Sequence, residues 1–165
     1  MHHEQHIVGS MNALTSTAPT AARSTPAPRL LDLGLAAFAV LYIAEALFMT
    51  VSPHAFYTSI GPFNAYNPHY LRDNATFSAA LGVGLAVSVV RPGWRVPMLA
   101  VTALQYALHS VNHLVDIDIA HPRWTGYFDF FSLLAATLVL VWLLRTAIAC
   151  ERAAALASHR KETRR

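Results

Sequence analysis

Four long apolar runs dominate this chain and constrain its fold more than any other feature. They cover about residues 30–51, 67–90, 96–117 and 125–149, and each is long enough to cross the ~30 Å hydrocarbon core of a bilayer as an α-helix. Only 13% of the residues are charged and 55% are hydrophobic, whereas a soluble domain carries roughly 25% charged residues. The sequence therefore predicts an all-α fold, a four-transmembrane-helix bundle.

The segments at the two ends have a different composition. Residues 1–29 mix Ala, Thr, Ser and Pro after a histidine-rich start and show no apolar periodicity. This composition predicts a disordered cytoplasmic tail. Residues 30–149 then form the transmembrane domain, and residues 150–165 form a basic cytoplasmic tail.

Local signals mark the second helix. Asn67 is a good N-cap residue, Pro68 suits the first helical position, and residues 91–93, Arg-Pro-Gly, predict the end of the helix. Ser78 and Gly82 lie four residues apart, which allows close approach of a neighbouring helix. Packing within the bundle is the expected use of these small residues.

Basic residues predict the orientation in the membrane. On one side of a four-span arrangement lie Arg23, Arg29, Arg91, Arg95, Arg145, Arg152, Arg160, Lys161, Arg164 and Arg165. Only Arg72 and Arg123 fall on the other side. The positive-inside rule then places both termini in the cytoplasm and the links 52–66 and 118–124 on the outer side of the plasma membrane. The net charge of +3 reflects this topology and attraction to anionic lipid, and no motif indicates nucleic-acid binding.

Ionisable side chains within the spans gather toward the outer face, while the inner halves contain almost none. The predicted polar cluster comprises Glu45, His69, Arg72, Asp73, His109, His113, Asp116 and Asp129. On the third span, one helical stripe carries Gln105, His109, Asn112, His113 and Asp116. A charged residue at mid-membrane costs about 2.5–3.5 kcal/mol, so these groups are expected to face one another.

Three interpretations of this cluster stay open. In a structural network, Arg72 pairs with Glu45, Asp73 or Asp129, and the chain is a non-catalytic accessory or scaffold subunit, alone or as a homo-oligomer. In a metal site, His109 and His113 at i and i+4 bind a divalent metal such as zinc, iron or manganese, completed by Glu45 and Asp73.

In a quinone or lipid pocket, Glu45, His109 and His113 exchange protons with the ligand. The aromatic walls of such a pocket would come from Tyr106, Trp124 and Phe128.

One segment carries a family resemblance. Residues 52–73, SPHAFYTSIGPFNAYNPHYLRD, precede a small-residue helix, an Arg-Pro turn and a third span ending in HSVNHLVD. Over roughly residues 30–148 the chain resembles a group of small uncharacterised bacterial four-helix integral membrane proteins, and its plan is similar to that of DoxX-type membrane proteins. The first resemblance implies fold and location, and the second implies a membrane subunit in quinone-linked redox chemistry.

Overall fold

The computed structural model describes residues 26–63 and 65–164, and every regular element in these ranges is a helix. In chain order they are α1 (Pro26–Val51), α2 (Pro53–Ser59), α3 (Pro68–Val90), the 3₁₀ turn η1 (Pro92–Trp94), α4 (Arg95–Val115) and α5 (Arg123–Glu162). The predicted all-α class is confirmed for the described part of the chain. The disordered tail predicted over residues 1–29 lies almost wholly outside it.

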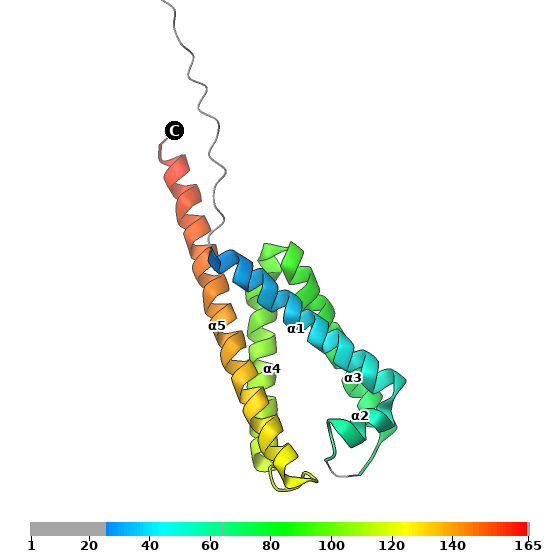
Figure 1. Cartoon of the computed structure of the whole chain (residues 1–165). Helices are drawn as coiled ribbons and strands as arrows, with labels where there is room; N and C mark the ends of the chain where they lie inside the picture. The colour runs from blue at the N-terminus through cyan, green and yellow to red at the C-terminus, as the bar shows by residue number, and fades with distance from the viewer. Residues whose placement is uncertain (1–25, 64, 165) are drawn as a thin grey trace, which may run out of the picture.

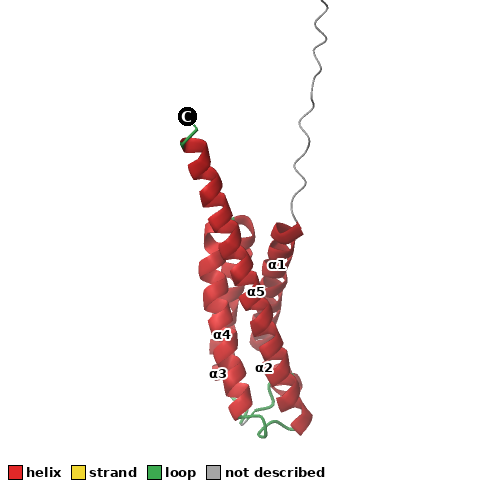
Figure 2. Cartoon of the chain, turned by 90° about the vertical axis from the view of Figure 1, so that its left-hand side faces the viewer, coloured by secondary structure: helices red, strands yellow, loops and turns green. Residues whose placement is uncertain are grey.

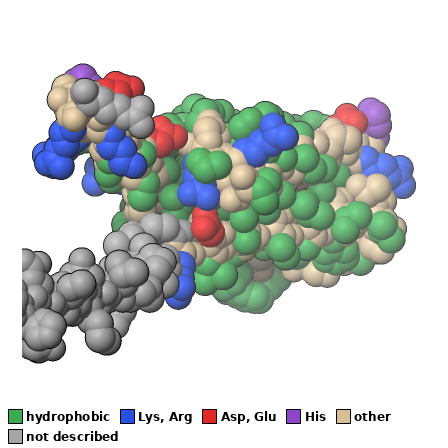
Figure 3. Space-filling model, turned by 90° about the horizontal axis from the view of Figure 1, so that it is seen from above, with side chains coloured by type: hydrophobic (Ala, Val, Ile, Leu, Met, Phe, Trp, Pro, Cys, Tyr) green, Lys and Arg blue, Asp and Glu red, His purple; other side chains and the backbone are tan. Residues whose placement is uncertain are grey.

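Three of the described helices are long and apolar enough to cross a membrane, over Arg29–Val51, Pro68–Val90 and Arg123–Glu162. No more than 39% of their most apolar stretches is buried inside the protein, and in Figure 3 hydrophobic side chains cover most of the visible described surface. A lipid environment accounts for this exposed apolar surface. α4 has 21 residues but stands outside this group, because its polar stripe lowers its hydropathy.

The long helices pack as two pairs. α1 lies chiefly against α3, and α4 lies chiefly against α5 (Figures 1 and 2). The pairs meet at the end where the α3–α4 turn lies, and Leu31 and Leu35 of α1 share a fully buried core there with Leu140 and Leu143 of α5. A second, smaller core contains Ala46, Met49, Phe56 and Ala75 and fixes α2 on the α1/α3 pair.

The signals predicted for α3 are confirmed. The Asn67 side chain accepts hydrogen bonds from the backbone N–H groups of His69 and Tyr70, and η1 follows the end of the helix. Gly82 lies against α1, since a Cβ atom there would be 2.8 Å from Cγ1 of Ile43 and 3.2 Å from its backbone nitrogen. The small residue therefore serves packing within the bundle, as expected.

Two features at the closed end of the bundle, the end where the two helix pairs meet, differ from the prediction. α5 does not end near residue 149 but continues to Glu162, so most of the predicted basic tail is helical. In addition, the inner half of α1 contains a paired charge, Asp32, whose Oδ1 lies 2.7 Å from Nη2 of Arg95. Arg95 also donates hydrogen bonds to the carbonyl oxygens of Ser88 and Val89. This ion pair joins α1, the end of α3 and the start of α4.

Candidate functional site

A cavity of about 600 Å³ separates the two helix pairs toward the α2 end. Its walls are mostly apolar, and five helices contribute to them. The apolar lining comes from Leu41, Ala44, Phe48, Phe56, Ile60, Phe63, Tyr106, Leu133 and Ala136. The polar lining comes from Glu45, Asn74, His109, His113, Asp129 and Ser132.

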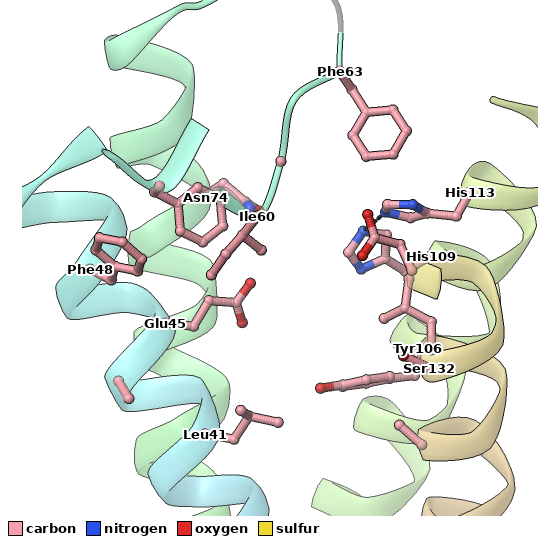
Figure 4. A pocket seen from close by; sticks show the side chains of 16 residues that line it. Leu41, Glu45, Phe48, Ile60, Phe63, Asn74, Tyr106, His109, His113 and Ser132 are labelled. Atoms are coloured by element: carbon pink, nitrogen blue, oxygen red, sulfur yellow. Dashed lines mark hydrogen bonds between the residues drawn. The ribbon is translucent and has the colours of Figure 1, made fainter. Parts of the chain in front are cut away.

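The ionisable groups stand on facing walls. Figure 4 shows the Glu45 carboxyl group projecting from α1 into the cavity, with His109 and His113 on α4 across from it. The Tyr106 ring lies deeper on the α4 side. Asp129 belongs to α5, which packs beside α4. The cavity thus places a carboxyl group on one wall and an imidazole pair on the other.

The two histidines contact each other directly. Their Nε2 atoms lie 3.1 Å apart, a hydrogen bond in which one ring donates and the other accepts. The i,i+4 spacing on α4 produces this contact. His113 Nδ1 is buried and has no hydrogen-bond partner within the described protein, and the same holds for Oδ2 of Asp129. Buried polar atoms rarely lack a partner, so these two atoms mark the part of the site whose polar groups are least well satisfied by the protein.

The segment that follows α2 covers one end of the cavity. The Phe63 ring stands edge-on to His113, with ring centroids 4.8 Å apart, and Ile60 lies beside it on the same loop. Phe48 and Phe56 make a second edge-on pair at 5.6 Å. This end is therefore closed by aromatic and aliphatic side chains.

A smaller cavity of about 50 Å³ adjoins the first and shares Glu45, Asn74 and His109 with it. At its far side the Tyr42 hydroxyl donates a 2.6 Å hydrogen bond to Oε1 of Gln105. This bond links α1 to α4 across the gap between the helix pairs. Gln105, which belongs to the predicted polar stripe on α4, thus has a structural role.

The structure brings together only part of the predicted polar cluster. Glu45, His109, His113 and Asp129 line the large cavity. The remaining members, His69, Arg72, Asp73 and Asp116, lie elsewhere.

Three of these four residues lie on the exposed side of α3. His69 pairs with Asp73 at 3.5 Å, but the two side chains are 87% and 66% exposed. Arg72 is exposed as well, and no carboxylate of the described residues forms an ion pair with it. The predicted network centred on Arg72 is therefore not formed.

The predicted metal-ligand set is not assembled either. Asp73 is held by His69 on the far side of α3, away from His109 and His113. Among the residues that the structure describes, no three His, Cys, Asp or Glu side chains are grouped so as to hold a metal ion. The i,i+4 histidine pair is present without the surrounding ligands that a metal centre requires.

The cavity also contains residues that the sequence did not single out for it. Asn74 and Ser132 are polar lining groups, and Phe48, Phe56 and Phe63 replace two of the expected aromatic walls. Trp124 and Phe128 make an edge-on contact with ring centroids 6.1 Å apart, and 65% and 61% of their surfaces are exposed. The aromatic residues of the 52–66 link were the sequence signal from which these cavity walls could have been predicted, because a link this rich in aromatic rings can cover an apolar cavity.

The chain matches no protein-family model, no curated protein and no solved structure.

Proposed function

We propose that this integral membrane protein binds a quinone-type ligand in the cavity between its helix pairs. A benzoquinone head has an apolar ring with two opposed oxygen atoms, so it needs apolar walls and a hydrogen-bonding group on each side. The cavity offers this pattern, with Glu45 on α1 facing the His109–His113 pair on α4. This facing arrangement is the observation that carries the proposal.

The ionisable groups suit the proton chemistry of such a ligand. Two protons leave the hydroxyl groups of a quinol for each molecule oxidised, and the two walls supply one proton-accepting group each. The two electrons pass to a separate redox protein in this proposal.

The alternative of a purely structural polar cluster fits the geometry less well. Groups that only fix helix register should pair with one another and leave no space between them. Tyr42 and Gln105 behave in this way, whereas Glu45 has no hydrogen bond within the described protein and faces a cavity. We therefore favour ligand binding over a scaffold role.

The proposal includes an orientation. α4 also crosses the membrane, as the third of four spans in chain order, with its polar stripe turned toward the cavity and its apolar residues toward lipid and α5. Both termini then lie in the cytoplasm, and the cavity lies in the outer half of a bacterial plasma membrane. The support is the distribution of basic residues, which flank the inner ends of the spans.

Binding of a tail-less benzoquinone to the protein in lipid nanodiscs tests the function. We expect the double variant His109→Ala/His113→Ala to bind about tenfold or more weakly, since lost hydrogen bonds of ~1–3 kcal/mol correspond to that range. His69→Ala/Asp73→Ala is the matched control, because it removes an i,i+4 His/carboxylate pair outside the cavity. Calorimetric titration showing no binding to the wild type, or equal loss in both variants, would contradict the proposal.

A further inference from the structure

The lining of the large cavity reaches the outer surface between α1 and α5. Leu41 and Ala44 on α1 and Ser132 on α5 line the cavity and are also exposed on the outside of the bundle. Together with Ala136 on α5 they border a side opening, and three of these four side chains are small. At the closed end α1 and α5 meet, where Gly34 lies against Leu143.

Parts of the other boundaries of the cavity are covered. Phe63 stands over the end beyond His113. α3 packs along α1, and α4 packs along α5, so neither pair leaves a gap between its own helices. The route between α1 and α5 is bordered by small side chains.

This opening lies within membrane-crossing stretches of both helices. Ala44 lies about 10 Å along α1 from Val51, the last residue of the Arg29–Val51 span, and Ser132 lies about 14 Å along α5 from its first residue, Arg123, at 1.5 Å per residue. Both rim positions therefore fall at the depth of the hydrocarbon core, where acyl and isoprenoid chains reside. A molecule that passes through the opening comes from lipid and not from water.

We infer that the site takes a lipid-tailed ligand, whose head enters between α1 and α5 and whose isoprenoid or alkyl tail stays in this opening. The inference rests on the proposed quinone-binding function and extends it by naming the class of ligand and its route. The small side chains of Ala44, Ser132 and Ala136 leave the width that a flexible chain needs. Glu45, one residue beyond Ala44, meets the head group as it enters.

The test compares two probes in nanodiscs: a benzoquinone with a full-length isoprenoid tail and the same benzoquinone without a tail. Ala44→Phe and Ser132→Phe narrow the opening. Ala37→Phe and Ala135→Phe are matched controls, since these exposed alanines on the same helices line no described cavity. The readout is the midpoint of thermal unfolding as a function of probe concentration, because a ligand that binds the native state raises it.

We expect the two narrowed variants to need about tenfold more tailed quinone for the same rise in midpoint, a difference of roughly 1.4 kcal/mol. Both side chains also line the cavity, so the tail-less quinone should bind these variants more weakly as well, but by a clearly smaller factor than the tailed quinone. An unchanged response to the tailed quinone, or an equal loss for both probes, overturns the inference and leaves the proposed function standing. Absence of any response of the wild type to either probe overturns the proposed function itself.

Discussion

Glu45 is the residue on which the chemistry of the cavity depends most directly. It projects from α1 toward the histidine pair and has no hydrogen-bond partner among the described residues. A carboxyl group at this depth is costly in a membrane protein unless a polar partner or a bound molecule compensates for it. Its position one helical turn from the Tyr42–Gln105 bond keeps it at the junction of the two cavities.

Two substitutions at Glu45 should show how much its hydrogen-bonding group contributes to the binding of benzoquinone. A quinone oxygen only accepts hydrogen bonds, so Glu45 contacts a quinone as a protonated carboxyl group that donates its O–H, and accepts a proton only from a quinol. Glu45→Gln keeps a donor of similar shape, so we expect tail-less benzoquinone to bind within about threefold of the wild type. Glu45→Ala removes the donor, and we expect binding about tenfold weaker or more. Calorimetric titration in nanodiscs measures both. Equal affinity of Glu45→Ala and the wild type would show that this carboxyl group does not contact the probe.

At the residue scale, the sequence predicted the members of the site on α1, α4 and α5 but not those on α3. His109 and His113 are four residues apart on one helix, so their position on a common helix face could be predicted from the sequence alone. The direction of His69 and Asp73 depends on which face of α3 packs against α1. The small residues Ser78 and Gly82 define the face of α3 that packs against α1. At 100° per residue, His69 and Asp73 lie on the opposite, outward face.

The packing of α3 on α1 is the contact that sets the shape of the first helix pair. Gly82→Ala should lower the free energy of unfolding by about 1–3 kcal/mol, because the added Cβ meets the backbone and side chain of Ile43. Gly93→Ala is the matched control, since a Cβ there meets nothing within 4 Å. Thermal unfolding in detergent compares the two, and equal midpoints would contradict this account of α3.

The Asp32–Arg95 pair should hold the closed end of the bundle together. The Arg95 side chain is 17% exposed, and it also donates hydrogen bonds to carbonyl oxygens at the end of α3. We expect Asp32→Asn to reduce stability by about 1–2 kcal/mol, since it weakens a charge-assisted hydrogen bond. Asp118→Asn, which alters the exposed Asp118–Arg123 pair, should leave the unfolding midpoint unchanged. Similar shifts for the two variants would contradict the structural role of Arg95.

Helix boundaries were predictable where capping residues mark them. Asn67 and the Arg-Pro-Gly turn fixed the ends of α3 within one residue. The end of α5 was missed because the apolar run stops near residue 149 while the helix does not. The run Ala153 to Ala157 has high helix propensity without marking a membrane span, so hydropathy alone could not show the extension.

For the whole molecule, the two helix pairs join at one end and separate at the other, and the cavity follows from this shape. The sequence predicted the four long helices but not the short helix α2, and three of the four are clear candidates for membrane spans. It did not predict the separation of the helix pairs, since hydropathy carries no information on the angle between packed helices. The α1–α5 contact at Gly34 and the aromatic residues of the 52–66 link close the two ends. The resemblance to DoxX-type proteins stays a prediction.

The proposed orientation predicts which surfaces face the outside of the cell. With Cys150 replaced by Ser, a Ser59→Cys variant in intact bacteria should react with a membrane-impermeant maleimide, because the α2 link faces outward. A His159→Cys variant at the end of α5 should react only after the cells are broken. Mass spectrometry of the labelled protein distinguishes the two cases, and the reverse pattern would contradict the orientation.

Photoaffinity labelling with a photoreactive benzoquinone, followed by peptide mapping, reports whether a quinone-type ligand occupies the cavity. We expect crosslinks to the cavity-lining parts of α1 and α4, around Glu45 and around His109 to His113, which excess unlabelled benzoquinone prevents. The His69 to Asp73 face of α3 should remain unlabelled. Crosslinks spread over the lipid-facing helices, or labelling that unlabelled benzoquinone does not reduce, would contradict the site.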